Sequence, residues 1–283
     1  QSLKKIIMKF MDNLVTIVIP VYNEKNYIID CLKSLLEQDF KKIEILVVDG
    51  GSTDRTIEIL VDFMADHPQI RLINNSKKYT VHAFNLGILN SDKEAEYITF
   101  LNCHAKYSST RLSRLINYLN KYDVDAVGGV SLASSRNDSY FGLASALILR
   151  STFSTGSKFR TAITKPEFVE TASGCLYKKS IFKNIGIFNE DLICSQDIEL
   201  NKRIINKGGR ILLVPDVITH YKSRGDIKSF LMHTYRNGKW AIMPFFYSKI
   251  IPVSLRHLVP IIALLIFIFL SVLTLLGIIS LSP

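Results

Sequence analysis

The stretch Glu96-Tyr97-Ile98-Thr99-Phe100-Leu101-Asn102-Cys103-His104 decides the fold. It begins as an apolar, β-branched run, which is typical of a buried strand, and it stops abruptly at three polar or metal-capable side chains. In an α/β domain such a strand is held inside the sheet, and its carboxyl end opens into the crevice where ligands bind. We therefore expect chemistry at residues 102–104.

Apolar runs alternate with segments of helical periodicity on both sides of this stretch. Runs at 15–22, 43–49 and 70–73 precede it, and each is followed by apolar residues spaced as on one face of a helix. A further helix and strand are expected at 112–119 and 125–130. This alternation predicts an α/β fold with a mostly parallel, doubly wound, Rossmann-like sheet.

The later part of the chain carries weaker signals. Residues 133–166 are rich in Ser, Thr and Gly, and we expect a short helix at about 140–150 within a mobile loop over the cleft. One strand is predicted over 167–177, then a helix at 198–205 that stops at two glycines, and a last strand at 211–215.

The net charge of +10 is concentrated near the C-terminus, where residues 200–256 hold eleven cations and two acids. Such a band could face nucleic acid, anionic lipid or a pyrophosphate group. Residues 258–283 carry no charge and are long enough to cross a bilayer, which needs about 20 residues. The flanking cations predict a cytoplasmic catalytic part at the cell membrane, with an amphipathic segment lying on anionic lipid. A buried soluble helix is the alternative for 258–283.

The placement of charges and cysteines argues against a nucleic-acid-binding protein and against a zinc- or disulfide-stabilised fold. The basic band adjoins the apolar segment and has no nucleic-acid motif beside it, so we expect no nucleic-acid partner. The four cysteines are far apart in sequence and form no CxxC pair, which argues against a zinc ribbon or a disulfide framework and fits a reducing compartment.

Four blocks of sequence resemble, in order, the family 2 glycosyltransferases with the GT-A fold. The blocks are 16–24 (TIVIPVYNE), 45–54 (ILVVDGGSTD), 195–203 (SQDIELNKR) and 235–240 (YRNGKW). Residues 102–107 (NCHAKY) most resemble the Asp-Ala-His-Ala-x-Tyr version found in succinoglycan-biosynthesis-type, membrane-associated glucosyltransferases. The resemblance runs from about residue 14 to 245.

This resemblance implies a domain organisation. An N-terminal extension at 1–13 precedes a GT-A catalytic domain at 14–222. An amphipathic interfacial segment at 223–256 and a transmembrane helix at 257–283 follow.

The resemblance also implies a donor site. Pro20, Tyr22 and Glu24 would line the nucleoside, Asp49 would accept hydrogen bonds from the base or ribose, and Asp54 would support that loop. From the residues alone, turn formation and helix capping remain the alternative for the two aspartates. Lys77 and Asn102 complete the predicted donor site.

Inverting transfer needs a general base for the acceptor hydroxyl and stabilisation of the departing nucleoside diphosphate. Asp197 lies at a predicted helix start and matches the acid of the family motif, although an acid there also favours the helix dipole. Arg224, Arg236 and Trp240 match family positions near the acceptor and leaving group. Arginine suits a diphosphate and Trp offers a stacking face, with an interfacial belt as the alternative.

The predicted metal site departs from the family. Members usually hold a divalent cation through Asp-x-Asp or Asp-x-His, whereas here Asn102 leads and His104 follows. Asn102 can ligate through its carbonyl oxygen with less electrostatic pull. His220, after the last strand, could reach the metal or the diphosphate, or could be a surface or packed histidine.

Three outcomes remain open for that site. Mn²⁺ or Mg²⁺ binds through His104, the donor phosphates and His220; basic side chains such as Lys77 or Lys78 replace the metal; or nucleotide binds without efficient transfer. The favoured function is inverting transfer from a nucleotide-sugar, with UDP-sugar favoured, to a lipid-linked or polysaccharide acceptor at the cytoplasmic membrane face. A polyprenyl-phosphate sugar synthase and a non-catalytic nucleotide-sugar-binding assembly subunit are the alternatives.

Overall fold

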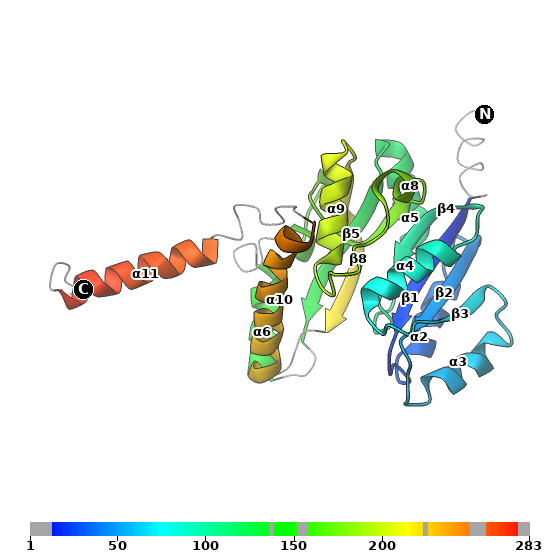
Figure 1. Ribbon diagram of the computed structural model, residues 1–283, viewed down its shortest axis with the longest axis horizontal. Helices are drawn as coiled ribbons and strands as arrows, with labels where there is room; N and C mark the ends of the chain where they lie inside the picture. Colours follow the sequence, from blue (N-terminus) through cyan, green and yellow to red (C-terminus); the bar gives the residue numbers. More distant parts are fainter. Residues whose placement is uncertain (1–12, 136–138, 152–157, 223–225, 249–258, 277–283) are drawn as a thin grey trace.

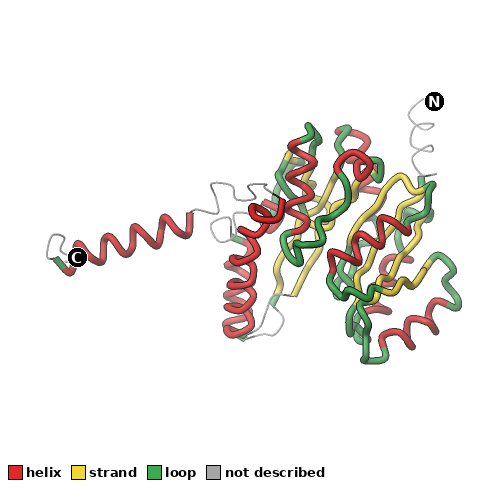
Figure 2. Tube along the Cα trace, in the orientation of Figure 1, coloured by secondary structure: helices red, strands yellow, loops and turns green. Residues whose placement is uncertain are grey.

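A single eight-stranded sheet runs through the computed structural model, which describes residues 13–135, 139–151, 158–222, 226–248 and 259–276. The strand order is β3-β2-β1-β4-β7-β5-β8-β6, and helices cover both faces (Figures 1 and 2). The strands are β1 (Leu14–Val21), β2 (Ile43–Asp49), β3 (Ile70–Asn74), β4 (Ala95–Phe100), β5 (Ala126–Ser134), β6 (Glu167–Phe168), β7 (Ser173–Lys178) and β8 (Ile211–Lys222). The helices are α2 (Ile28–Leu36), α3 (Thr56–Met64), α4 (Thr80–Asn90), α5 (Arg111–Tyr122), α6 (Tyr140–Arg150), η1 (Lys158–Arg160), α8 (Ile181–Ile185), α9 (Gln196–Asn206), α10 (Ile227–Ser248) and α11 (Val259–Leu275).

β1 is the central strand of the N-terminal half and is apolar on both faces, as a strand covered on both sides must be. Ile17 and Ile19 belong to the core cluster that packs beneath α2, α3 and α5. Val18 belongs to the opposite cluster, beneath α4, α8 and α9. A Cβ at Gly87 of α4 would lie 2.4 Å from the Val18 side chain, so a glycine is needed for this close approach.

The doubly wound prediction is confirmed for the coarse α/β fold, but the sheet is mixed. Four of its seven strand pairings are parallel and three are antiparallel. The single strand predicted over 167–177 is wrong, because this segment forms two strands that lie far apart in the sheet. β6 pairs with β8 at the edge, and β7 is inserted antiparallel between β4 and β5.

β8 is longer than the strand predicted at 211–215. Its pairing with β5 shifts from Gly129↔Val214 to Val130↔Ile218, so that residues 215–217 bulge out of the ladder. A Cβ at Gly129 would lie 2.0 Å from the Val217 carbonyl oxygen, and glycine therefore accommodates the bulge. Beyond it the strand resumes and carries His220.

The C-terminal helices lie at the β5–β8 end of the molecule (Figure 1). The predicted helix at 140–150 is confirmed as α6, and α10 occupies much of the predicted interfacial segment. α11 has 17 residues and lies within the predicted transmembrane segment, whose remaining residues fall outside the described ranges. Over the part of the chain that the structure describes, no helix is long and apolar enough to span a membrane.

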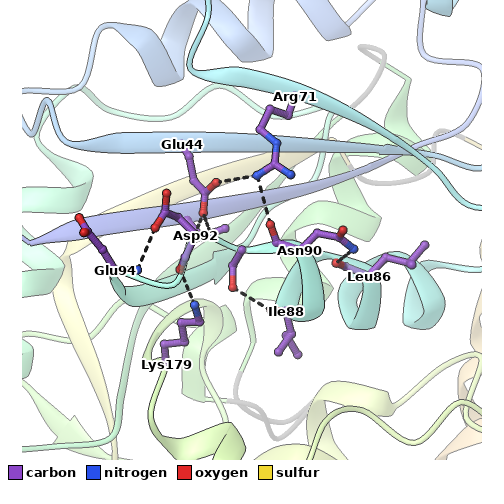
Figure 3. A network of polar contacts seen from close by, with 10 residues as sticks. Glu44, Arg71, Leu86, Ile88, Asn90, Asp92, Glu94 and Lys179 are labelled. Carbon is purple, nitrogen blue, oxygen red and sulfur yellow. Dashed lines mark hydrogen bonds and ion pairs between the residues drawn. The ribbon is translucent and has the colours of Figure 1, made fainter.

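A polar network ties the amino ends of the N-terminal strands together (Figure 3). Glu44 on β2 is buried and accepts hydrogen bonds from the Thr16 hydroxyl of β1 at 2.5 Å and from the Asp92 N–H before β4 at 2.6 Å. Arg71 on β3 contacts the other Glu44 oxygen at 3.4 Å and the Asn90 carbonyl at 3.2 Å. One carboxylate thus links β1, β2, β3 and the entrance to β4.

Removing this carboxylate tests the network. In Glu44→Ala, the Thr16 hydroxyl and the Asp92 N–H lose their acceptor inside the protein, so we expect the free energy of unfolding to fall by about 2–3 kcal/mol. Glu58→Ala, which removes an exposed ion pair with Arg55, is the matched control and should cost under about 0.5 kcal/mol. Urea denaturation measures both, and equal losses would refute the role given to Glu44.

Candidate active site

The carboxyl ends of β1, β2 and β4 meet at one edge of the sheet, because these strands are parallel and paired in register. Val21 lies opposite Asp49, and Val18 lies opposite Phe100. The loops that leave β1 and β4 therefore emerge side by side, as expected for ligand binding at this edge.

A cavity of about 150 Å³ lies at this edge. Three groups of residues line it: Pro20, Val21, Tyr22 and Glu24 from β1 and its loop; Asn102, Cys103 and His104 after β4; and Val48, Asn75, Lys78, Thr80 and Ala83 around the ends of β2 and β3 and the start of α4. Five of the predicted site residues thus share one cavity, namely Pro20, Tyr22, Glu24, Asn102 and His104.

Glu24 and His104 are the closest ionisable pair in the cavity. The His104 Nδ1 lies 3.5 Å from the Glu24 Oε1, and the Glu24 N–H donates to the Thr56 hydroxyl at 2.9 Å. Among the described residues, no three His, Cys, Asp or Glu side chains gather closely enough to hold a metal ion by themselves. A cation here would therefore need further ligands, such as donor phosphates, and His220 does not complete a three-residue cluster with this pair.

Asp49 and Asp54 order the turn after β2. Asp49 is buried and accepts hydrogen bonds from the Gly51 N–H at 2.8 Å and the Ser52 hydroxyl at 2.5 Å. Asp54 accepts from the Thr56 N–H at 3.2 Å at the start of α3. These are the turn and capping contacts expected as the alternative roles, and the donor-site roles of both aspartates stay predictions.

The two lysines before α4 diverge. Lys77 places its Nζ 2.6 Å from Glu190 and pairs with it, away from the residues that line the cavity. Lys78 has a left-handed backbone with φ of 67° and lines the cavity. The structure therefore brings Lys78, rather than Lys77, to the donor cavity.

Tyr107 and Arg111 hold the Asn102 loop from beneath, and neither was predicted as a site residue. The Tyr107 hydroxyl accepts from the Asn102 N–H and donates to the Asn102 carbonyl, both at 2.9 Å. The Arg111 guanidinium lies 5.4 Å from the Tyr107 ring centroid and donates to Gly174 O at 2.6 Å and Thr219 Oγ1 at 3.1 Å. A cation in the first turn of α5 opposes the helix dipole, and that is the sequence signal that could have drawn attention to Arg111.

Two cysteines pack behind the same loop. The Cys31 thiol faces the Asn102 carbonyl at 3.7 Å, and both Cys31 and Cys103 are buried. Contact with Cys31, together with burial, raises the pKa of the Cys103 thiol far above its usual range. Cys103 is therefore a neutral packing group, although it touches the cavity.

Asp197 lies in the first turn of α9, after Ser195 with a φ of 61°. Its side chain keeps an open surface, yet the protein around it displaces much of its water, and this desolvation raises the pKa of the carboxyl above its ordinary value. Hydrogen bonds from the Ile198 N–H and its own backbone, and the charge of Arg160, act in the opposite direction. A carboxylate with a raised pKa is a better proton acceptor than an ordinary surface aspartate.

Arg160, another residue that the sequence reasoning missed, joins Asp197 to the end of β8. Its Nη1 donates to the Tyr221 hydroxyl at 2.5 Å, and its guanidinium lies 5.4 Å from the Tyr221 ring centroid. Its position in a short 3-10 turn within a Ser- and Thr-rich segment gave no pattern that would have singled it out.

The remaining predicted residues lie in the C-terminal half. His220 is exposed on β8, opposite Leu132 of β5. Arg236 of α10 lies near the start of α9, where its charge acts on Cys194, and Trp240 is half-buried on the same helix. Arg224 lies outside the described residues.

Comparison with known proteins gives the family. The sequence model of glycosyl transferase family 2 matches residues 16–186, which is more than half of the chain. The chain therefore belongs to glycosyl transferase family 2, as the motifs predicted, and it is a nucleotide-sugar-dependent glycosyltransferase.

Two curated relatives show how far the similarity extends. The chain is 30% identical over 236 residues to a dolichyl N-acetyl-alpha-D-glucosaminyl phosphate 3-beta-D-2,3-diacetamido-2,3-dideoxy-beta-D-glucuronosyltransferase of Methanococcus voltae, covering 80% of this chain and 72% of the relative. It is 25% identical over 247 residues to the succinoglycan biosynthesis protein ExoA of Rhizobium meliloti, covering 86% and 73%. The predicted likeness to succinoglycan-type enzymes is confirmed.

Solved structures confirm the GT-A-like fold. TarS of S. aureus in complex with UDP-GlcNAc matches with a TM-score of 0.57 at 18% identity, over 76% of this chain and 60% of TarS. The mannosyltransferase PcManGT of Pyrobaculum calidifontis, in complex with GDP-Man and Mn²⁺, matches with a TM-score of 0.57 at 20% identity, over 79% and 64%. The chain spans less than two thirds of either solved chain.

Removal of the Tyr107 hydroxyl tests the support beneath the Asn102 loop. Tyr107→Phe leaves the Asn102 N–H without its acceptor and the Asn102 carbonyl with only the Cys31 thiol, so we expect a loss of about 1–2 kcal/mol in the free energy of unfolding and up to about tenfold weaker binding of UDP or GDP. Tyr122→Phe, a half-buried tyrosine at the other end of α5, is the control. Urea denaturation and calorimetric titration give the two values, and unchanged nucleotide affinity in Tyr107→Phe would show that the loop does not depend on this contact.

Proposed function

We propose that the protein is an inverting glycosyltransferase that moves a sugar from a nucleotide-sugar, with UDP-sugar favoured, to a lipid-linked or polysaccharide acceptor. The observation that carries this proposal is the cavity in which Pro20, Tyr22 and Glu24 meet Asn102 and His104. The M. voltae relative is named for transfer to a dolichyl-phosphate-linked sugar, and ExoA for succinoglycan biosynthesis. Both names support an acceptor that carries a lipid or belongs to a polysaccharide.

The donor lies in a cavity that is lined mainly by uncharged side chains and by a few charged ones. Tyr22 at the cavity rim offers an aromatic face to the base, and Lys78 supplies a cation for the diphosphate. Asp49, whose carboxylate is engaged by the turn, acts on the donor chiefly by keeping the Gly50–Thr53 loop in shape.

The residues that follow the carboxyl end of β4 can hold a divalent cation. The Asn102 side-chain oxygen, the His104 imidazole and the neighbouring Glu24 carboxylate are donors that Mn²⁺ accepts, and donor phosphates would complete the set. Bound there, the cation supplies neutralisation of the diphosphate charge. PcManGT, which shares the fold, is described with Mn²⁺ and GDP-Man. The His220 contribution remains a prediction without a neighbouring ligand to support it.

The transfer step uses Asp197 as the general base. Its carboxylate takes the proton of the acceptor hydroxyl as that oxygen forms a bond to the anomeric carbon, and the bond from that carbon to the nucleoside diphosphate breaks. Attack opposite the departing group inverts the anomeric centre. Arg236 lies near the start of α9 and would stabilise negative charge on the leaving group or acceptor.

Location at the cytoplasmic face of a membrane is part of the proposal. Residues 258–283 carry no charge, and the described part of α11 exposes apolar side chains such as Leu264, Phe267 and Phe269. The cations of residues 200–256 precede this segment and would favour anionic lipid on the cytoplasmic side.

Two alternatives share the same site. A polyprenyl-phosphate sugar synthase would use the same donor site, with a lipid phosphate oxygen that is already ionised as the nucleophile. A non-catalytic nucleotide-sugar-binding subunit is favoured by one observation, the neutral Asn102 where family members usually carry an aspartate. The retained Asp197, which matches the acid of the family motif, argues against this second alternative.

Release of nucleoside diphosphate tests the function directly. Purified full-length protein is given UDP-, GDP- and TDP-sugars with membrane lipid extract, with Mn²⁺ or Mg²⁺ and again with EDTA. We expect one donor to be consumed and EDTA to abolish its consumption, because the donor set at Asn102 and His104 needs a cation to offset the diphosphate charge. EDTA-resistant release would assign that role to Lys78 and the arginines.

Asn102→Asp separates a weakened enzyme from a binding subunit. A faster Asn102→Asp variant indicates a catalyst whose cation site is weakened by the amide. No turnover from the parent or from this variant, with nucleotide binding intact, would replace the transferase proposal with the binding-subunit alternative.

The pH dependence of transfer reports on Asp197. Because the base must be ionised and its pKa is raised, we expect kcat/KM to fall as the pH decreases through a value above the ordinary aspartate pKa of about 3.9. Arg160→Gln removes a charge that lowers this pKa, so the acid limb of the pH–rate profile should move to higher pH.

Asp197→Asn should lower kcat by about 10²- to 10⁴-fold. Asp191→Asn, an exposed aspartate in the preceding loop, is the control, and equal rates in both variants would remove Asp197 from the mechanism.

A further inference from the structure

α6 presents an outward face that is largely apolar, with the exposed Arg150 at its C-terminal end. Its inward side is formed by Gly142, Ser145 and Ala146, which are buried against the body of the protein. The outward side carries Tyr140, Leu143, Ala144, Leu147 and Ile148. The exposed fraction is 95% for Tyr140, 48% for Leu143, 68% for Leu147 and 53% for Ile148. A surface helix normally turns polar residues outward, so we expect this apolar face to contact a binding partner.

α10 extends the same surface. The rings of Phe141 on α6 and Phe230 on α10 pack edge to face with centroids 5.7 Å apart, so the two helices lie side by side (Figure 1). Next to this contact, α10 exposes Leu231, Met232 and Tyr235. Two helices from distant parts of the sequence thus form one surface, which combines exposed apolar side chains with the exposed cations Lys228, Arg236 and Lys239 of α10.

Charge is distributed to suit an anionic partner at this end of the molecule. Residues 139–151 and 158–166 contain four cations and no acid, although Lys158 pairs with Glu167. Residues 226–248 contain three cations and one acid. The opposite end of the sheet is acidic, since residues 54–66 around α3 hold four acids and one cation (Figure 1).

We propose that the face formed by α6 and α10 docks on an anionic lipid bilayer. An apolar helix face flanked by cations is the pattern of an interfacial membrane helix, whereas a protein interface would carry a polar rim with hydrogen-bonding groups. The uncharged α11 follows α10 in the chain and favours the same partner. The inference rests on the proposed membrane location and adds to it a specific docking surface, α6, within the catalytic body.

Docking through α6 would bring the region around Asp197, the proposed base, close to the lipid headgroups. α6 packs on β5, and Arg150 at its end donates to the Ala133 carbonyl of β5 at 2.6 Å. β5 pairs with β8, whose Tyr221 is bonded to Arg160, the cation that acts on Asp197. The β5–β8 pairing and the hydrogen bond from Arg160 to Tyr221 therefore connect α6 with the cation whose charge acts on Asp197, and docking there would let the base meet acceptors that are held in the membrane.

The single tryptophan of the chain allows a direct test. In a Trp240→Phe background, Leu147→Trp places a probe on the outward face of α6, and Val61→Trp places a matched exposed probe on α3 at the acidic end. Full-length protein is mixed with vesicles of equal parts phosphatidylglycerol and phosphatidylcholine, with plain or brominated acyl chains. We expect the Leu147→Trp emission to shift to shorter wavelength and to lose most of its intensity with brominated lipid, while Val61→Trp stays unchanged.

Each other result overturns the inference in a different way. Equal emission from Leu147→Trp in plain and brominated vesicles, with quenching of a Phe267→Trp probe on α11, would mean that the protein binds lipid but turns α6 away from it. Absence of quenching at both positions would remove the membrane location as well. A shift that occurs without lipid and grows with protein concentration would make the face an interface between copies of the chain.

Activity supplies a second readout. Leu147→Glu combined with Ile148→Glu should lower transfer to acceptors in membrane extract by roughly tenfold or more, because two apolar contacts with lipid are replaced by charge. Donor hydrolysis measured without lipid should stay unchanged, as should both activities in the control pair Val61→Glu with Leu89→Glu. If the parent releases no nucleoside diphosphate from any donor even with membrane extract, the transferase proposal fails, while the fluorescence test of the docking face still stands by itself.

Discussion

The parallel pairing of β1 with β2 and β4 is the constraint on which the site depends. Because the three strands run in one direction with their ladders in register, the residues that follow Val21, Asp49 and Phe100 must emerge at the same edge. Burial of β1 on both faces maintains this register, since a slip of one residue would exchange the side chains packed under α2 and α4. The donor cavity is thus a consequence of strand pairing, and its side chains are contributed by loops that the sheet holds in place.

The N-terminal half could be predicted because its signals are local. Each of β1, β2 and β4 is a continuous apolar run that ends in polar residues, so a site at residues 102–104 could be expected from the residues, and the family resemblance added Pro20 and Glu24. The C-terminal half could not, because β6 and β7 are short strands separated by four residues, and nothing in their periodicity reveals that they pair with different partners. The bulge in β8 depends on a contact between Gly129 and Val217, which are far apart in sequence.

The details of the site that sequence reasoning missed share a physical cause, namely that they depend on backbone direction or on burial. Lys77 and Lys78 are equivalent as sequence, but a left-handed φ at Lys78 sends one side chain to the cavity and leaves the other on Glu190. The raised pKa of Asp197 arises from surrounding atoms contributed by several elements. The sequence signal at Arg111 is a cation in the first turn of a helix, and only the fold shows this side chain buried beneath the Asn102 loop.

Arg111 also determines how the two halves of the sheet respond to ionic strength. Its described partners are a carbonyl, a hydroxyl and an aromatic ring, all of them neutral, and the guanidinium itself is buried. Dissolved ions screen charges that face water, so the exposed bridge from Lys77 to Glu190 between the halves should weaken in concentrated salt, whereas the buried Arg111 binds neutral groups and has no opposite charge there to be screened. The geometry between the donor loop and β8 should therefore persist in brines that strip the protein of its surface ion pairs.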